Sequence, residues 1–266
     1  MLNYFFNVEN SNKKLFDGLN ISQNQDAMKH FNRYPIIYIS FKDVKEDNFE
    51  LSFKRIAQLI DKEFSKYQDM IDSTLEKNSR ADREHYRRII SNRASKVDIG
   101  NSFKLLSKLL TIAYNQKCIV LIDEYDTPIQ TGFLKGYYDE IVGFFKTFMG
   151  AVLKDNDTYI YKAVLTGILR VSKESIFSDL NNIEVYTLLD DEFNNRFGFT
   201  TDEVKSMLGE YGLLDRFEEV ERWYDGYKIG GCAIYNPWSL LSFVNRKKID
   251  VYWANTSSNG IIRTLV

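Results

Sequence analysis

Short apolar segments alternate with longer amphipathic segments along the first two thirds of the chain. Three of the apolar segments are rich in β-branched residues: IIYISF at 36–41, CIVLI at 118–122 and AVLTGI at 163–168. Runs in which neighbouring positions are both apolar are typical of strands buried on both faces, as in parallel sheets. A weaker run at 183–188, IEVYTL, is a fourth strand candidate.

The segments between these runs have the residue spacing of helices. Apolar residues recur every three or four positions at 49–67, at 103–114 and at 137–153. Each segment therefore has one apolar stripe, as on a helix that packs against a core. Strands separated by helices predict right-handed crossovers and a parallel, layered α/β sheet.

The remainder of the chain has a different pattern, in which short helical segments flank a turn and a short strand. The expected elements are a helix at 200–211 capped at Thr201, a helix at 213–223, a turn at 223–227, a strand at 233–235, a helix from Pro237 and a last helix after Asn259. Threonine is a common helix cap, and acidic residues favour the first turn. The sequence therefore predicts two domains, an α/β core over 1–190 and a small helical, winged-helix-like subdomain over 191–266.

The charge pattern gives no reason to expect a nucleic-acid-binding surface. The net charge is −2, so no overall field attracts nucleic acid or anionic lipid. Five arginines between Arg80 and Arg93 are interleaved with Asp82 and Glu84, as on a solvated helix face.

Other residue types narrow the class of protein further. Two cysteines and two histidines without metal-ligand spacing argue against a disulfide framework and a zinc site, and they favour a cytoplasmic location. The longest apolar segment, Ile141–Leu153, is interrupted by Lys146 and is too short to cross a bilayer. No membrane association is therefore expected.

The segment CIVLIDEYD at 118–126 has the form of a Walker B motif, an apolar strand that ends in Asp-Glu. Ligands of open α/β sheets bind at the carboxyl ends of the strands, where Asp123 is expected to hold the magnesium ion that bridges nucleotide phosphates. Glu124 is suited to polarising the water that attacks the terminal phosphate. An Asp-Glu pair that only begins the loop after a strand explains the same residues, so this segment alone leaves both explanations open.

A second polar position, Thr166, ends another expected strand, and Arg170 follows it shortly. Such ATPases keep a sensor residue beside the Walker B strand, and a guanidinium group matches phosphate geometry. Taken alone, the segment is better explained by a strand-end threonine and a surface arginine.

The motif that normally binds the phosphates is absent from the sequence. There is no Gly-x-x-x-x-Gly-Lys-Ser/Thr segment, and no glycine is followed by lysine. In P-loop proteins the backbone amides of that loop and its lysine hold the phosphates. Asp123 would therefore face a site that lacks most of its binding energy for ATP.

Several short segments, in order along the chain, resemble one family. They are LFDG at 15–18, YPIIYISFKD at 34–43, VLIDEYDTP at 120–128, AVLTGILR at 163–170, SIF at 175–177, WYDGY at 223–227, YNPW at 235–238 and WANTSS at 253–258. Through them the chain is similar to the bacterial and archaeal AAA-ATPase-like proteins, which often carry a C-terminal nuclease-like domain of the PD-(D/E)xK type. The resemblance covers essentially the whole chain.

The resemblance implies a fold and a role for each site residue. The implied fold is a P-loop NTPase-like three-layer parallel sheet that lacks its P-loop strand, with a small helical C-terminal subdomain. Asp123 would be the magnesium-side acid, Glu124 the catalytic base, Thr166 the sensor and Arg170 a phosphate-facing arginine. ATP and magnesium would be the cofactors of the full-length protein, and nucleic acid would be bound only through a missing C-terminal domain. The WYDGY and YNPW segments would shape the subdomain rather than perform chemistry, because Tyr and Trp pack large areas.

The resemblance further suggests that the chain is truncated before residue 1, so that it begins inside the helix that follows the P-loop. Loss of the P-loop strand would leave the runs at 163–168 and 183–188 without their shared neighbour. Unpaired buried backbone groups are costly, and bare strand edges favour aggregation. We therefore expect either that these two strands pair with each other or that the chain is poorly stable alone.

Three functions remain open from the sequence. The first is an ATPase core that is inactive in this chain for lack of a P-loop. The second is a non-catalytic scaffold derived from an ATPase, whose partner is another protein or a second copy of the chain. The third is a metal-dependent nuclease site formed by Asp123, Glu124 and Asp126, although no lysine or further acid on an adjacent strand points to it.

Overall fold

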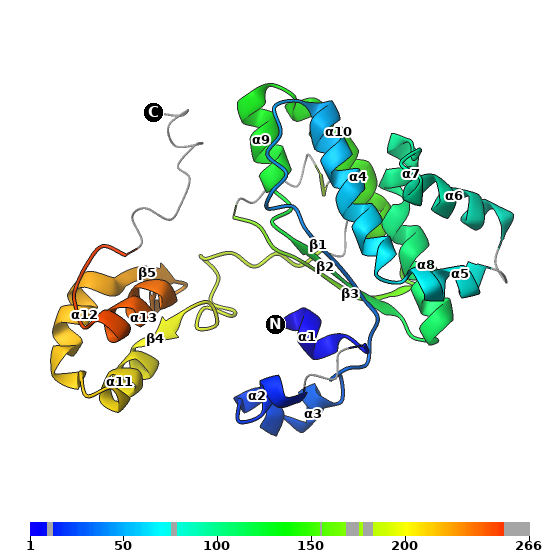
Figure 1. The fold of residues 1–266 in the computed structure, drawn as a ribbon. Coiled ribbons are helices and arrows are strands. Elements are labelled where there is room, and N and C mark those ends of the chain that lie inside the picture. Colours follow the sequence, from blue (N-terminus) through cyan, green and yellow to red (C-terminus); the bar gives the residue numbers. More distant parts are fainter. Residues whose placement is uncertain (10–12, 76–78, 155, 169–175, 178–182, 253–266) are drawn as a thin grey trace. The chain divides into compact units, whose positions relative to one another are not determined.

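A parallel three-stranded sheet forms the centre of the N-terminal part of the molecule (Figure 1). The computed structural model describes residues 1–9, 13–75, 79–154, 156–168, 176–177 and 183–252. They divide into two compact units, Met1–Asn181 and Asn182–Val266. The sheet has the order β1 (Ile36–Ser40), β2 (Cys118–Asp123) and β3 (Ile160–Leu165), and both pairings are parallel. The α/β class and the strands expected at 36–41 and 118–122 are therefore confirmed, whereas the strand expected at 163–168 spans residues 160–165 and ends before Thr166.

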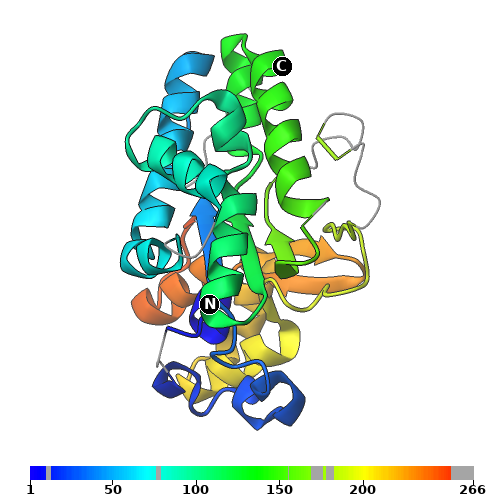
Figure 2. The same cartoon turned by 90° about the vertical axis from the view of Figure 1, so that its right-hand side faces the viewer.

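One face of this sheet packs against three long helices, which lie together in both views (Figures 1 and 2). These helices are α4 (Phe49–Ser65), α8 (Ser102–Tyr114) and α10 (Tyr138–Leu153). Fully buried aromatic and aliphatic side chains on their inner faces meet the strand residues Ile37 and Val120. Burial of this area from water is the main force that holds the helices on the sheet.

The alternate strand residues form a smaller cluster on the opposite face. Ile36, Ile119 and Leu121 are buried there with Tyr34, and Phe6 packs against them. Successive side chains of a strand point to opposite faces, so a strand with apolar residues at every position builds both clusters.

The remaining elements of this unit are α1 (Leu2–Phe6), η1 (Lys13–Phe16), α2 (Asn20–Gln23), α3 (Gln25–Met28), α5 (Gln68–Leu75), α6 (Arg80–Ile90), α7 (Lys96–Gly100) and α9 (Thr127–Lys135).

Among the described residues, side chains and not another strand close the outer edge of β1. The Glu63 carboxylate accepts the backbone N–H of Tyr38 at 2.9 Å, and the Tyr67 hydroxyl donates to the carbonyl of Ile36 at 2.5 Å. Glu63 is buried and also pairs with Lys66. These contacts satisfy strand-edge groups that would otherwise be available to another chain.

The fourth strand candidate, at 183–188, is not a strand. Its apolar side chains are largely exposed, with Val185, Tyr186 and Leu188 between 40% and 58% accessible, so no burial favours an extended pairing there. Among the described residues, β2 is the only strand that pairs with β3. The expectation that these two segments pair with each other was therefore wrong, and the low stability of the chain alone stays a prediction.

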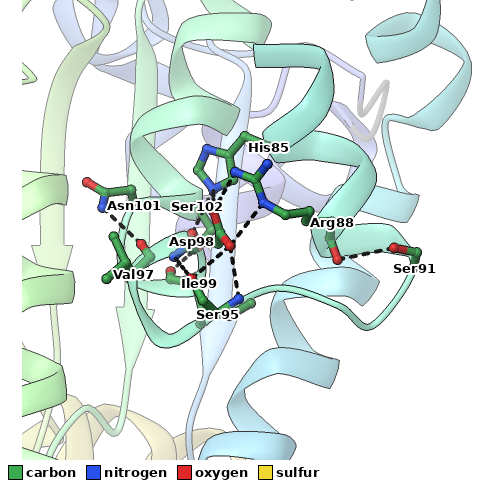
Figure 3. A network of polar contacts seen from close by, with 9 residues as sticks. All are labelled: His85, Arg88, Ser91, Ser95, Val97, Asp98, Ile99, Asn101 and Ser102. Carbon is green, nitrogen blue, oxygen red and sulfur yellow. Dashed lines mark hydrogen bonds and ion pairs between the residues drawn. The ribbon is translucent and has the colours of Figure 1, made fainter. Parts of the chain in front are cut away.

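A polar network fixes the start of α7 against α6 (Figure 3). Ser95 and Asp98 form a capping box, and the guanidinium group of Arg88 on α6 donates twice to the Asp98 carboxylate. His85 Nε2 lies 2.8 Å from the carbonyl oxygen of Asp98. A second ion pair lies on α6 itself, where Glu84 pairs with Arg80.

The second unit combines short helices with an antiparallel sheet of order β4-β6-β5. Its elements are β4 (Phe199–Thr200), α11 (Thr201–Glu210), η2 (Leu214–Arg216), α12 (Phe217–Tyr224), β5 (Asp225–Ile229), β6 (Cys232–Tyr235) and α13 (Pro237–Arg246). Its core contains Val204, Leu208, Val220, Tyr235 and Phe243.

The second unit differs from the sequence prediction in several details, since β4 was not expected and the helix expected at 213–223 is η2 followed by α12. The cap of α11 is Thr200, not Thr201, and it forms a capping box with Glu203. The expected turn at 223–227 is instead the end of α12 and the start of β5, and the chain reverses at Gly230, whose φ of 51° suits glycine. The helix expected after Asn259 lies outside the described residues. In the described ranges no helix is both long and apolar enough to cross a membrane.

Candidate functional site

Three polar side chains meet where the strands of the parallel sheet end. Asp123 is the last residue of β2, and Ser40, the last residue of β1, is its register partner. Thr166 comes directly after β3 and continues the ladder, because its N–H donates to the carbonyl of Ile122 at 2.9 Å. Parallel strands place their carboxyl ends at one edge of the sheet, and this edge is where ligands of open α/β sheets bind.

The hydroxyl groups of both neighbours point to the Asp123 carboxylate. Thr166 Oγ1 donates to Asp123 Oδ1 at 2.5 Å, and Ser40 Oγ donates to Asp123 Oδ2 at 3.3 Å. Each carboxylate oxygen thus has one hydroxyl partner, which restricts the rotation of the half-buried side chain. The sequence placed Asp123 and Thr166 at adjacent strand ends, as found here. It did not single out Ser40, although a polar residue at the end of an apolar strand was a readable signal.

Glu124 begins a sharp turn after β2. Its φ is 51°, in the left-handed region that residues with a side chain rarely occupy. The carboxylate of Glu124 accepts a hydrogen bond from the hydroxyl of Thr127, the first residue of α9, at 3.2 Å. Backbone strain of this kind is concentrated at functional sites, where the surrounding structure holds it in place.

Asp126 has a different environment from Asp123. It is fully buried, and its Oδ2 accepts the N–H of Ile168 at 3.0 Å and the side-chain amide of Gln130 at 2.5 Å. It therefore joins the loop after β2 to the loop after β3. Sequence reasoning considered Asp126 only as a third metal-binding acid.

The proposed nuclease triad of Asp123, Glu124 and Asp126 does not converge on one point. Within the described residues, no three His, Cys, Asp or Glu side chains are grouped so that they could hold a metal ion. Arg170, the remaining residue of the expected site, lies outside the described residues.

The donor atoms at the sheet edge fit magnesium better than a softer metal. The carboxylate of Asp123 and the hydroxyls of Ser40 and Thr166 are all hard oxygen ligands, which Mg²⁺ prefers. In the described part of the chain, neither Asp123 nor Glu124 forms an ion pair, so their negative charge is not balanced by a lysine or arginine. In a nucleotide-binding site the phosphates supply further ligands to the magnesium ion, so a single protein carboxylate is sufficient to hold the ion there.

Comparisons with known proteins identify the family of the chain. A protein of Azotobacter chroococcum mcd 1, described as an uncharacterized protein in the vnfD 5′ region, is 32% identical over 147 residues. That match covers 55% of this chain but only 28% of the relative, so this chain spans much less than the full length of that protein. No solved structure matches the chain. Residues 1–177, which include the whole parallel sheet and its carboxyl edge, match the sequence model of the family described as predicted AAA-ATPase, and the chain therefore belongs to this AAA-ATPase-like family.

Proposed function

We propose that the parallel sheet and its acidic edge form the hydrolytic side of a magnesium-ATP site. The observation that carries the proposal is the contact of Thr166 and Ser40 with Asp123 at the carboxyl edge of the sheet. Membership of the AAA-ATPase-like family supports it independently of that geometry.

Each residue at this edge has a separate role in the proposal. Magnesium supplies charge neutralisation of the phosphates when it is bound, and Asp123 is the residue that would hold it. Glu124 accepts a proton from, and orients, the attacking water. Thr166 donates its hydroxyl proton to the Asp123 carboxylate, so its oxygen is left to accept a hydrogen bond from the attacking water. Arg170 is assigned to the phosphates because a guanidinium group pairs with them through two parallel hydrogen bonds.

These 266 residues do not include a phosphate-binding loop, because no glycine in the sequence is followed by lysine. Phosphate binding in P-loop proteins depends on the amides and the lysine of that loop. We therefore propose that this chain by itself binds ATP weakly and does not hydrolyse it. ATP hydrolysis is assigned to a protein in which these residues are joined to a Gly-x-x-x-x-Gly-Lys-Ser/Thr segment.

The first test reads the DNA upstream of the Met1 codon in the same reading frame. It then measures ATP hydrolysis by the protein that the whole frame encodes. If a phosphate-binding loop is encoded there, we expect magnesium-dependent ATP hydrolysis by that protein. Glu124→Gln in it should retain ATP binding and lower kcat on the order of 100-fold or more, the usual contribution of a general base. The matched control is Glu210→Gln, which changes an exposed glutamate of the second unit.

Two results would contradict the proposal. One is a protein that contains the loop but neither binds nor hydrolyses ATP. The other is a Glu124→Gln variant with the kcat of the unchanged protein. Saturable binding of a protein partner that ATP does not alter would then favour the scaffold function.

A further inference from the structure

Asp126 is a buried acidic residue that has no assigned part in the proposed chemistry. Its side chain has no accessible surface, yet aspartate is seldom fully buried unless its carboxylate is paired or hydrogen-bonded. The backbone N–H of Ile168 and the amide of Gln130 both donate to its Oδ2. A carboxylate with such donors is a strong anchor, because hydrogen bonds to a charged acceptor are about twice as strong as neutral ones.

The anchor acts on the turn that carries Thr166. Ile168 lies two residues after Thr166, and Gly167 lies between them. The backbone of Thr166 is held on the other side, because its carbonyl accepts the N–H of Tyr125 at 3.1 Å. The turn is therefore held at two points, by Tyr125 before Gly167 and by Asp126 after it.

The close approach of Asp126 to this turn also explains the glycine at its centre. A Cβ atom on Gly167 would lie 2.7 Å from Asp126 Oδ1 and 2.9 Å from Tyr125 Cε1. Both distances are shorter than real Cβ contacts, so only glycine fits while the Asp126 carboxylate keeps its place. The steric fit and the hydrogen bond are separate observations of the same contact.

We propose that Asp126 is a positioning residue that acts through Thr166, by holding the Gly167–Ile168 turn so that the Thr166 hydroxyl stays on Asp123. This inference rests on the proposed ATPase function. The Asp126 carboxylate contacts Ile168, in the turn after Thr166, and Gln130 on α9, so we assign its effect on hydrolysis to the turn.

The test is a double-mutant cycle on the ATPase encoded by the whole reading frame, with kcat and KM for magnesium-ATP as readouts. We expect Asp126→Ala to lower kcat about 10- to 100-fold, the usual effect of losing a residue that orients a catalytic group, and to change KM less than about twofold. Thr166→Ala should lower kcat to a similar degree. The double variant should be no slower than Thr166→Ala alone, because both changes remove the same contact.

Two further variants keep the test valid if Asp126→Ala does not fold. Asp126→Asn retains one oxygen that can accept the Ile168 N–H, so it should restore most of the kcat lost in Asp126→Ala. The added methyl group of Gly167→Ala displaces the Asp126 carboxylate. This variant should lower kcat in the otherwise unchanged protein but not in the Thr166→Ala background.

The possible outcomes separate this inference from the function on which it rests. If the unchanged protein contains the phosphate-binding loop but does not hydrolyse ATP, the proposed function fails and the inference fails with it. If it is active but Asp126→Ala and Thr166→Ala lower kcat by factors that multiply in the double variant, only the inference is overturned. An Asp126→Asn variant as slow as Asp126→Ala in a folded protein would likewise overturn it.

Discussion

Asp98 joins α6 to the start of α7, and its replacement by alanine tests how much this junction stabilises the first unit (Figure 3). The Asp98 Oδ2 atom accepts the backbone N–H of Ser95 at 2.9 Å and the Ser95 hydroxyl at 2.8 Å. Arg88 donates to the two carboxylate oxygens at 3.1 and 2.7 Å. Asp98→Ala removes all four contacts and leaves both partners in place.

The expected loss of stability follows from these contacts and their exposure. Loss of half of a capping box costs about 0.5–2 kcal/mol, typically about 1. The Arg88 side chain is 45% exposed, so water replaces much of the lost ion pair and that contribution is about 0.2–1 kcal/mol. Together the free energy of unfolding should fall by about 1–3 kcal/mol, which lowers Tm by about 2–4 °C per kcal/mol in a unit of this size.

The pH dependence of this loss gives a sharper test than its size. The Arg88 guanidinium holds the pKa of the Asp98 carboxyl below its ordinary value of 3.8. An acid whose pKa is lowered by folding stabilises the folded protein above its unfolded pKa, and that contribution is lost as the pH falls toward the folded pKa. The difference in free energy of unfolding between the unchanged chain and Asp98→Ala should therefore be constant from pH 7 to about pH 5 and shrink below pH 4.

The assay is urea denaturation of the unchanged chain and of Asp98→Ala at several pH values between 3 and 7. Asp157→Ala, which changes an exposed loop aspartate, is the control and should leave the free energy of unfolding within about 0.5 kcal/mol of the unchanged chain. Equal stability of Asp98→Ala and the unchanged chain at pH 7 would refute the assigned contacts. A stability difference that does not shrink at low pH would refute the assigned ion pair.

The remaining predictions concern the side chains that close the edge of β1. Burial raises the pKa of Glu63, so the folded protein holds that proton more tightly than the unfolded chain does, and stability should decline as the pH rises from 4.5 through the folded pKa. Glu63→Gln keeps an acceptor for the N–H of Tyr38 and should flatten this decline in urea titrations between pH 4 and 8. Tyr67→Phe leaves the buried carbonyl of Ile36 without its donor and should lower the free energy of unfolding by about 1–3 kcal/mol at pH 7. An unchanged urea midpoint in Tyr67→Phe, or an unaltered pH profile in Glu63→Gln, would contradict the role assigned to that side chain.

The success of strand prediction along this chain depended on burial. The segments that became β1 and β2 contain apolar residues at consecutive positions, and a strand buried on both faces requires this pattern. β3 is only partly buried, and its first three residues, which include the exposed Tyr161 and Lys162, were not predicted as strand. β5 was missed because its residues, DGYKI, are mostly exposed at the edge of a small sheet. Such a strand is specified by pairing with β6 and by the turn at Gly230, not by its own hydrophobic pattern.

In the candidate site too, residues marked by the local sequence were predicted, and a residue defined by contacts distant in the chain was not. Asp123 and Thr166 were recognisable because each polar residue ends an apolar run, and parallel strands bring such ends to one edge. The role of Asp126 was not recognisable, because nothing in the DEYD segment distinguishes an acid that faces a ligand from one that anchors a neighbouring turn. Its burial and its bond to Ile168, 42 residues later, exist only in the folded chain.

The sequence by itself determined the types of the main elements, the α/β class and the two acids at the end of the central strand. These properties depend on the spacing of apolar and polar residues within ten or twenty positions, which is the range over which helix and strand periodicities act. Only the tertiary structure decided that β1 lies on the other side of β2, and that Ser40 and Thr166, 83 and 43 residues away from Asp123, contact its two carboxylate oxygens. Strand order results from the packing of the helices on the sheet and from which edges are closed, and no local pattern contains that information.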